Sequence, residues 1–333
     1  MECFWDDRQR AHAPAGEFFN GAMHPPAEHS GRVDAILQAI GPTQAPTDRG
    51  MEPLLRVHSA DYLDFLRTAH EEWRAAGREG DAFPYTFPVV GRRRLNLSRI
   101  DALLGQFSFD TSTPVAAGTW KAAYWAAQTA IAAAESVIGG GRSAFALCRP
   151  PGHHAGGDYL GGYSYLSNAA IAGEHAVADG RRVAILDVDY HHGNGTQDIF
   201  YDRPDVAFAS IHADPATDYP FFWGHADEAG AGEGESATLN LPLPRGTDWT
   251  GYAPALAKAL DWIERHEPDL LVVSFGADTY DGDPISHFKL KTSDYAPMAR
   301  LIAALRIPTV IVMEGGYAVE ALGRNVAEFL SGF

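Results

Sequence analysis

Five apolar segments, each followed directly by polar and ionisable residues, limit the possible folds of this chain more than any other feature. The segments are residues 143–150, 182–190, 205–213, 269–277 and 308–316. Their apolar residues are continuous, a pattern that is typical of parallel strands covered on both faces. Stretches of helix-forming residues precede or separate them, at 119–138, 168–180, 253–266 and 295–306. This alternation predicts a doubly wound α/β fold.

The length and composition are those of one large α/β domain. The chain has 333 residues, and 46% of them are apolar, enough for a substantial core. It contains no long uninterrupted apolar run and no apolar segment near residue 1, so we expect neither a membrane span nor a signal peptide. The only cysteines are Cys3 and Cys148, which disfavours a disulfide framework and favours a cytoplasmic location.

An excess of acidic residues narrows the class of ligand. The chain has 26 basic and 43 acidic residues, a formal net charge of −17. This charge disfavours nucleic acid as a partner, because phosphates are repelled, and it favours the approach of a cationic ligand. The first 118 residues are less regular, with predicted helices at 32–41 and 59–77 and a long loop at 81–98. We interpret the basic run Arg92 to Arg94 in that loop as solvated surface.

Each apolar segment ends in residues that are capable of chemistry. In chain order the sequences are RPPGHHAGG, DVDYHHGNG, SIHADP, GADTYDGDP and EGGY. In a parallel sheet the carboxyl ends of the strands meet at one edge, and ligands bind in the crevice outside it. We therefore predict that the functional site lies at this edge of the sheet.

Asp189, His191 and Asp278 form the candidate metal site. Asp189 and His191 are two residues apart at the end of one predicted strand, so their side chains point to the same side, and Asp278 ends another strand. Three such ligands leave a fourth position for water, as in a catalytic zinc site, although iron or cobalt accepts the same ligands. A two-metal site of the arginase type needs further carboxylates. Gly193 and Tyr280 occupy those positions, so we predict one catalytic ion.

Two histidines and a tyrosine are the candidate catalytic side chains. His153 and His154 follow Pro-Pro-Gly at a strand end, and imidazole is the natural general base near neutral pH. Asp187 and Asn194 are suited to orient the two rings. Tyr317 follows two glycines, and its hydroxyl can donate a hydrogen bond to a developing oxyanion.

These motifs resemble those of a known family. RPPGHHA, DVDYHHGNGTQ, GADTYDGDP and EGGY look like the motifs of zinc-dependent deacetylases of the histone deacetylase superfamily. Within it, VHSADYLDFL, RPPGHHAGGDYLGGYSYLSNAAIA, HHGNGTQDIFYDR and DPISHFKL are most similar to bacterial acetylpolyamine amidohydrolases. The similarity extends from about residue 14 to residue 333, nearly the whole chain.

The resemblance implies the arginase–deacetylase fold, an α/β fold with a central eight-stranded parallel sheet and helices on both faces. It implies a single deacetylase domain over residues 1–333. In this domain an inserted loop at about 78–113 takes part in forming a homodimer and narrows the entrance to the site. It also implies one zinc ion held by Asp189, His191 and Asp278, and a structural potassium ion near Asp187, Asp189, His191 and Ser210.

The resemblance also assigns roles to side chains at the site. His154 is implied to be the general base and acid, with His153 as its electrostatic partner. Tyr317 is implied to donate to the carbonyl oxygen. Tyr163 and Tyr219 match the aromatic pair that walls the tunnel for the acylated chain.

Acidic residues near the entrance bear on the substrate. Asp101 matches a position at which the polyamine enzymes carry an acid that can meet a cationic substrate tail. Ser112 stands at the other such position, with Asp110 close by.

The function that the resemblance implies is the removal of acetyl groups from small amines such as acetylputrescine or acetylcadaverine, which releases acetate and the free amine. Three alternatives remain. The chain could deacetylate acetyl-lysine in proteins, hydrolyse other small amides, or bind a ligand without turning it over.

Overall fold

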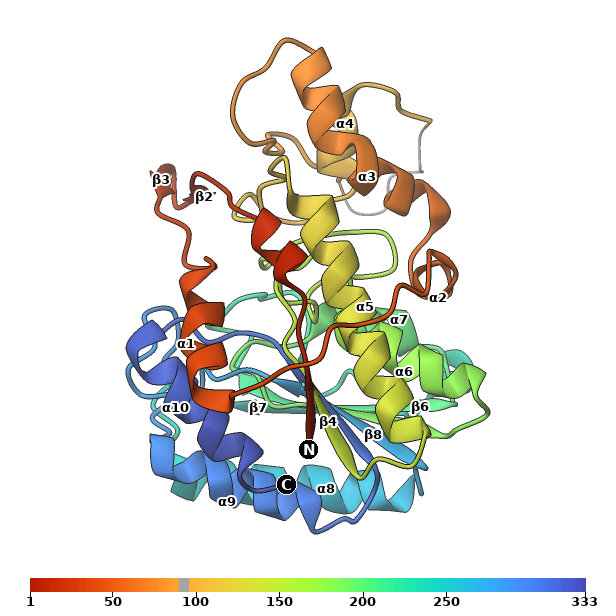
Figure 1. The fold of residues 1–333 in the computed structure, drawn as a ribbon, viewed down its shortest axis with the longest axis vertical. Coiled ribbons are helices and arrows are strands. Elements are labelled where there is room, and N and C mark those ends of the chain that lie inside the picture. The colour runs from red at the N-terminus through yellow and green to blue at the C-terminus, as the bar shows by residue number, and fades with distance from the viewer. Residues whose placement is uncertain (90–95) are drawn as a thin grey trace.

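Seven parallel strands form the central sheet in the part of the chain that the computed structural model describes, residues 1–89 and 96–333 (Figure 1). Every pair of neighbouring strands in it is parallel, which confirms the predicted fold class. The strand order is β1-β4-β9-β8-β5-β6-β7. The strands are β1 (Glu2–Phe4), β4 (Ser143–Ala146), β5 (Val183–Asp187), β6 (Val206–Ala213), β7 (Thr238–Leu243), β8 (Leu270–Phe275) and β9 (Thr309–Met313).

The expected number of eight strands is wrong for the described residues, and the edge beside β1 shows why. Gln44 makes a single parallel bridge there, accepting from Trp5 N at 3.0 Å and donating to Cys3 O at 2.8 Å. A strand would continue this ladder through the N–H groups two residues away on each side. Both positions hold proline, Pro42 and Pro46, which has no N–H to donate. The bridge therefore does not extend into an eighth strand.

Successive residues of the central strands enter two different cores, because side chains alternate between the faces of a sheet. On one face Ile185 packs with helices α5 (Thr119–Ile138) and α6 (Asn168–Ala178). On the other face Leu186 packs with residues of α1 (Gly31–Ile40), α8 (Trp249–Arg265), α9 (Thr292–Ala303) and α10 (Val319–Leu330). The predicted helices thus cover both faces, and none of the described helices is long and apolar enough to cross a membrane.

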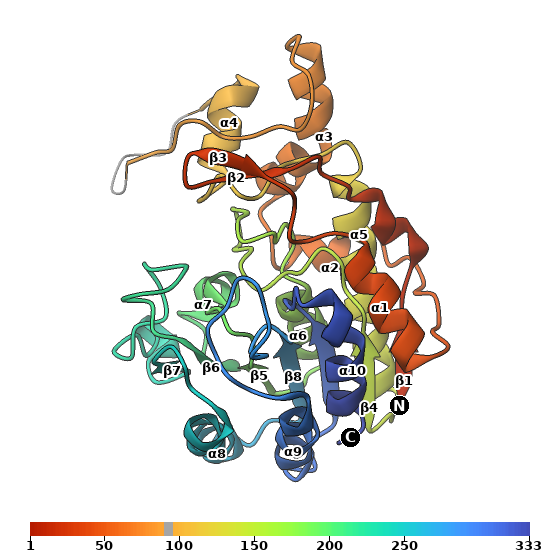
Figure 2. The ribbon, with the colours of Figure 1, turned by 90° about the vertical axis from the view of Figure 1, so that its left-hand side faces the viewer.

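A third apolar cluster supports the region above the carboxyl edge of the sheet. It joins α3 (Ala60–Ala75) and α4 (Ile100–Gln106) to α5, well away from the strands (Figure 1). The hairpin of β2 (Glu17–Phe19) and β3 (Ala22–His24) also lies above the strand-end loops (Figure 2). The remaining helices are short: α2 (Glu52–Leu55), α7 (Asn194–Phe200), and the 3₁₀ turns Asp7–Ala11 and Gly232–Gly234.

The predicted insertion, residues 78–113, belongs to this upper region. Residues 81–89 and 96–98 contain no helix or strand, as the long-loop prediction requires, although Ala82 forms an isolated antiparallel bridge with Val115. The insertion ends with α4 and the segment that follows it. The basic run Arg92 to Arg94 lies outside the described residues.

Candidate active site

The three candidate metal ligands meet at the carboxyl edge of the sheet. Asp189 follows β5 and Asp278 follows the neighbouring strand β8. One ligand atom from each of them and one from His191 all lie within 4.8 Å of one another. His191 Nδ1 is 3.1 Å from Asp278 Oδ2 and 3.4 Å from Asp189 Oδ1. The spacing of two residues and the pairing of β5 with β8 bring these side chains together.

These side chains fit a zinc ion. Both carboxylates are fully buried, and burial together with the charge of Asp189 raises the pKa of Asp278 to about 7. Buried carboxylates this close are stable as anions only beside a cation. Two carboxylates and one imidazole are a catalytic zinc set. Gly276 and Gly315 leave room for the carboxylates, because a Cβ at Gly276 would lie 2.0 Å from Asp189 Oδ2 and one at Gly315 would lie 2.5 Å from Asp278 Oδ2.

The paired histidines have different partners and opposite electrostatic environments. His153 Nδ1 is 2.9 Å from Asp187 Oδ2, and His154 Nδ1 is 2.6 Å from Asn194 Oδ1. Burial opposes protonation of His153, but the charges of Asp189 and Asp187 outweigh it and raise the pKa of His153 to about 10. Burial and the neighbouring positive rings instead lower the pKa of His154 well below its usual value. One ring is therefore set up as a cation and the other as a neutral base.

Glu314 supports the histidine pair and was not among the predicted residues. Its Oε2 accepts hydrogen bonds from Gly152 N at 2.6 Å and His153 N at 3.1 Å. Burial raises the pKa of this carboxyl to about 7. The sequence signal was available, because Glu314 begins the EGGY motif that contains Tyr317. Glu314 follows β9, which lies between β4 and β8 in the sheet. Its carboxylate therefore reaches the backbone N–H groups of Gly152 and His153, which follow β4.

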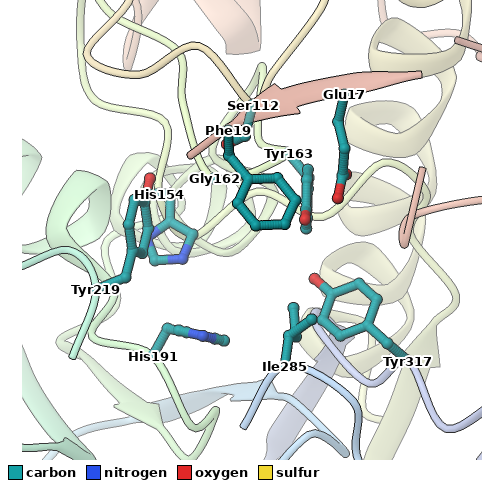
Figure 3. A pocket seen from close by; sticks show the side chains of 10 residues that line it. All are labelled: Glu17, Phe19, Ser112, His154, Gly162, Tyr163, His191, Tyr219, Ile285 and Tyr317. Carbon is teal, nitrogen blue, oxygen red and sulfur yellow. The ribbon is translucent and has the colours of Figure 1, made fainter. Parts of the chain in front are cut away.

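Three tyrosines enclose the space above the metal ligands (Figure 3). The ring centroid of Tyr219 is 5.2 Å from that of His154, and the ring of Tyr163 is 5.7 Å from that of Tyr317. Tyr317 is only 8% exposed, and burial raises the pKa of its phenol well above 10. The hydroxyl of Tyr317 therefore keeps its proton and can donate a hydrogen bond to a bound oxygen.

The backbone before Tyr163 explains why glycine precedes it. Gly162 and Tyr163 both adopt positive φ, 53° and 63°. A Cβ at Gly162 would lie 2.2 Å from the ring of His154, so no other residue fits there. Gly162 N donates to Asp110 Oδ2 at 2.8 Å, and the same oxygen accepts from the Tyr219 hydroxyl at 2.9 Å. Asp110 thus fixes both walls of the pocket.

The rim of the pocket contains residues that the sequence pattern did not indicate. Glu17 and Phe19 reach it from β2, and Ile285 reaches it from the loop after β8, while Ser112, which was singled out, also lines it (Figure 3). Glu17 shares a hydrogen bond with the Tyr163 hydroxyl, and burial raises the pKa of the Glu17 carboxyl. An acidic group therefore does stand at the rim, but it comes from residue 17.

Two other predicted residues lie outside this pocket. Asp101 forms ion pairs with Arg78 and with Arg99, the second at 2.8 Å. It does not line the pocket, and its role in substrate binding stays a prediction. Ser210 in β6 is paired in register with Asp187 in β5, and its hydroxyl is 2.8 Å from His212 Nδ1.

A comparison with known proteins agrees with this site. A family model described as the histone deacetylase domain matches residues 27–333. The chain belongs to this family. The prediction from the motifs is thereby confirmed, and the family identifies the chain as a deacetylase, a hydrolase that cleaves amide bonds.

Individual members of the histone deacetylase family are similar over their whole length. Acetylpolyamine amidohydrolase 1 of Pseudomonas aeruginosa is 51% identical, covering 100% of this chain and 99% of the relative. Acetylpolyamine amidohydrolase of Mycoplana ramosa is 45% identical, covering 95% and 94%. The crystal structure of acetylpolyamine aminohydrolase from Burkholderia pseudomallei superposes with a TM-score of 0.95 at 42% identity, covering 100% of this chain and 98% of the other.

Proposed function

We propose that this chain is a zinc-dependent deacetylase of small cationic acetylated amines, such as acetylputrescine and acetylcadaverine, and that it releases acetate and the free amine. The observation that carries the proposal is the set Asp189, His191 and Asp278, with both carboxylates buried, beside a tyrosine-walled pocket that Glu17 also lines. Relatives named as acetylpolyamine amidohydrolases, similar over the full chain, support the choice of substrate.

The proton transfers fall to His154. Bound zinc supplies Lewis acidity for the amide carbonyl and for the attacking water. Because Nδ1 of His154 is held by Asn194, its Nε2 is the nitrogen that takes a proton from the water and later gives it to the leaving amine. The low pKa of His154 keeps this nitrogen unprotonated before the attack. His153, held by Asp187, contributes positive charge beside it.

Tyr317 stabilises the oxygen of the amide carbonyl as it gains negative charge. Its hydroxyl donates a hydrogen bond to that oxygen, and it is placed for this by its position in the pocket wall opposite His191 (Figure 3). Tyr163 and Tyr219 hold the extended methylene chain of the substrate between them. Glu17 then meets the amine at the far end of the substrate.

The experiment that tests this function measures acetate release by the zinc-loaded protein. N-acetylcadaverine is compared with an acetyl-lysine peptide, and a larger kcat/KM for the small amine is the expected result. A larger value for the peptide would favour protein deacetylation. Slow turnover of both, with rapid turnover of another small amide, would keep the chemistry and replace the substrate. Stoichiometric binding without any turnover would contradict the proposal.

The remaining parts of the proposal concern assembly, ions and location. We retain a single domain whose insertion at 78–113 mediates a homodimer, and removal of residues 84–96 should halve the mass measured by light scattering. An unchanged mass would reject this role.

A potassium ion near Asp187 and Ser210 should raise the thermal midpoint in potassium buffers relative to tetramethylammonium buffers. A cytoplasmic location rests on the two cysteines, neither of which is paired.

A further inference from the structure

Tyr317 stands on a segment that has little conformational support of its own. It follows β9 through Glu314, Gly315 and Gly316, and α10 begins only at Val319. Gly315 is required by the carboxylate of Asp278, and Gly316 has a φ of 121°. Two successive glycines give a backbone many conformations. Ala277 N donates to Gly315 O at 3.0 Å and Gly315 N donates to Asp189 Oδ2 at 2.9 Å, but neither of these bonds involves the backbone of Tyr317 itself.

The carboxylate of Asp283 is bonded to the backbone of this segment. Its Oδ2 accepts hydrogen bonds from Tyr317 N at 2.6 Å and from Ala318 N at 3.2 Å. Its Oδ1 accepts from Ile285 N at 3.1 Å. Asp283 is buried, and hydrogen bonds to a buried carboxylate are stronger than those between neutral groups. One side chain thus joins the tyrosine segment to the loop that carries Ile285.

The carbonyl groups of the same segment have a separate partner. Arg32 donates from Nη2 to Glu314 O at 2.5 Å and from Nε to Gly316 O at 2.7 Å. Gly316 O and Tyr317 N belong to the same planar peptide group, so Arg32 and Asp283 hold this group from its two sides. The next N–H group, that of Ala318, is bonded to Asp283 alone of these two side chains.

Both residues joined by Asp283 face the pocket. Tyr317 and Ile285 line it side by side (Figure 3). A shift of about 1 Å at a catalytic group can lower the rate by about a hundredfold. The bonds from Asp283 therefore act on a position where small displacements matter.

We propose that Asp283 is a positioning residue, which holds the Tyr317 hydroxyl at the carbonyl oxygen of the substrate and sets the adjacent wall at Ile285. This inference rests on the proposed function, because it assumes that Tyr317 acts in turnover. It predicts that most of the contribution of the carboxylate to kcat is made through Tyr317.

A double-mutant cycle tests this coupling with the zinc-loaded full chain and N-acetylcadaverine. Asp283→Ala should lower kcat by about thirtyfold, with KM changed by less than about threefold, since the tyrosine is displaced but the tunnel remains. In a Tyr317→Phe background the same change should lower kcat by less than about threefold, because the hydroxyl that it positions is already absent. Equal factors in the two backgrounds, or a kcat within threefold of wild type for Asp283→Ala, would overturn the proposal.

Controls separate positioning from loss of structure. Asp281→Asn is the matched variant, because Asp281 lies in the same loop but pairs with Lys289 and Lys291 instead of the tyrosine segment; its kcat should equal that of the wild type. Zinc content and the thermal midpoint are measured for every variant. If Asp283→Ala does not fold, Asp283→Asn enters the same cycle, because it keeps one acceptor oxygen and loses the other.

The cycle also distinguishes the two proposals. A Tyr317→Phe variant with wild-type turnover would remove the tyrosine from the proposed mechanism, and the positioning role with it. A crippled Tyr317→Phe variant together with an unaffected Asp283→Ala variant would leave the proposed function intact and reject Asp283 alone.

Discussion

The floor and the rim of the pocket are built by different parts of the chain. The floor consists of the proposed metal ligands, the two histidines and Tyr317, all of which follow strands β4, β5, β8 and β9 of one sheet. The rim consists of Glu17, Phe19, Ser112 and Ile285, of which the first three come from the irregular first 118 residues. A sheet brings its strand ends together by hydrogen bonding. The rim instead depends on contacts such as that between the hairpin and the segment after α4, where Thr111 Oγ1 donates to Phe18 O at 2.8 Å. The chemistry and the specificity therefore have separate structural origins.

The largest expected effect is on the floor. Removal of metal with a chelator, or Asp278→Asn, should abolish acetate release, because the metal supplies the electrophile and one of its three ligands is weakened. Zinc should restore the chelated wild type but not the variant. Acetate release and zinc content are measured in parallel. Full turnover by a protein shown to contain no metal would break the assignment of the floor.

Tyr317→Phe should follow in size. It should lower kcat by about a hundredfold or more with little change in KM, which is the usual cost of removing a donor to an oxyanion. The ring and its packing against Tyr163 are retained, so the thermal midpoint should not change. Steady-state kinetics with N-acetylcadaverine measure this effect. A loss in kcat smaller than tenfold would mean that Tyr317 only lines the pocket and does not stabilise the oxyanion.

Glu17→Gln should have a smaller effect, confined to the rim. We expect about a fivefold lower kcat/KM for N-acetylcadaverine, mainly through KM, because one carboxylate near a partly solvated cation contributes about 1 kcal/mol. A neutral N-alkylacetamide of the same length is the matched substrate and should be unaffected. Equal losses for both substrates would show instead that Glu17 acts by holding the Tyr163 hydroxyl.

A change at buried His12 should have the smallest effect on turnover, because it should alter only the pH dependence of stability. Burial lowers the pKa of His12 to about 4, below its unfolded value of about 6.5. The unfolded chain therefore binds a proton that the folded chain excludes. The resulting stability is complete above pH 6.5 and is lost as the pH falls toward 4, by up to about 1.4 kcal/mol per pH unit.

His12→Asn removes this titration and retains a polar atom near Nδ1, which is 2.9 Å from Thr119 Oγ1. The thermal midpoint of the wild type should fall more steeply between pH 7 and pH 5 than that of the variant, as followed by circular dichroism. Parallel curves would mean that the pKa of His12 is the same in the folded and the unfolded chain. Acetate release at pH 8 should be the same for both proteins.

The floor of the pocket could be predicted from the sequence better than the rim. The predicted strand over 182–190 ends at Asp187 in the structure, so Asp189 and His191 lie in the bend after β5, and the pairing of β5 with β8 brings Asp278 close to them. The phenol of Tyr317 also lies in the predicted pocket. Glu314 was missed although it lies in a motif that was noted, because a carboxylate that binds backbone N–H groups carries no spacing pattern.

The rim gave weaker signals. Asp101 is predicted to meet the cationic tail of the substrate; its carboxylate pairs with Arg78 and Arg99, and its role stays a prediction. No sequence pattern around Glu17 indicates a functional residue. Its position in the pocket depends on contacts with segments that are about a hundred residues away in the chain. The resemblance implies an eighth strand, which Pro42 and Pro46 prevent. Both prolines are visible in the sequence, but they matter only because Gln44 pairs with the edge strand β1.

The sequence by itself determined the class of fold, the edge of the sheet that carries the site and the residue types that meet there. It could do so because continuous apolar strands and short strand-end motifs are local patterns whose geometry is set by the backbone. Only the tertiary structure decided which acid faces the pocket, which carboxylate holds Tyr317 and how opposite charge states fall on two adjacent histidines. These properties depend on burial and on distances between groups that are far apart in the chain, and no local pattern encodes them.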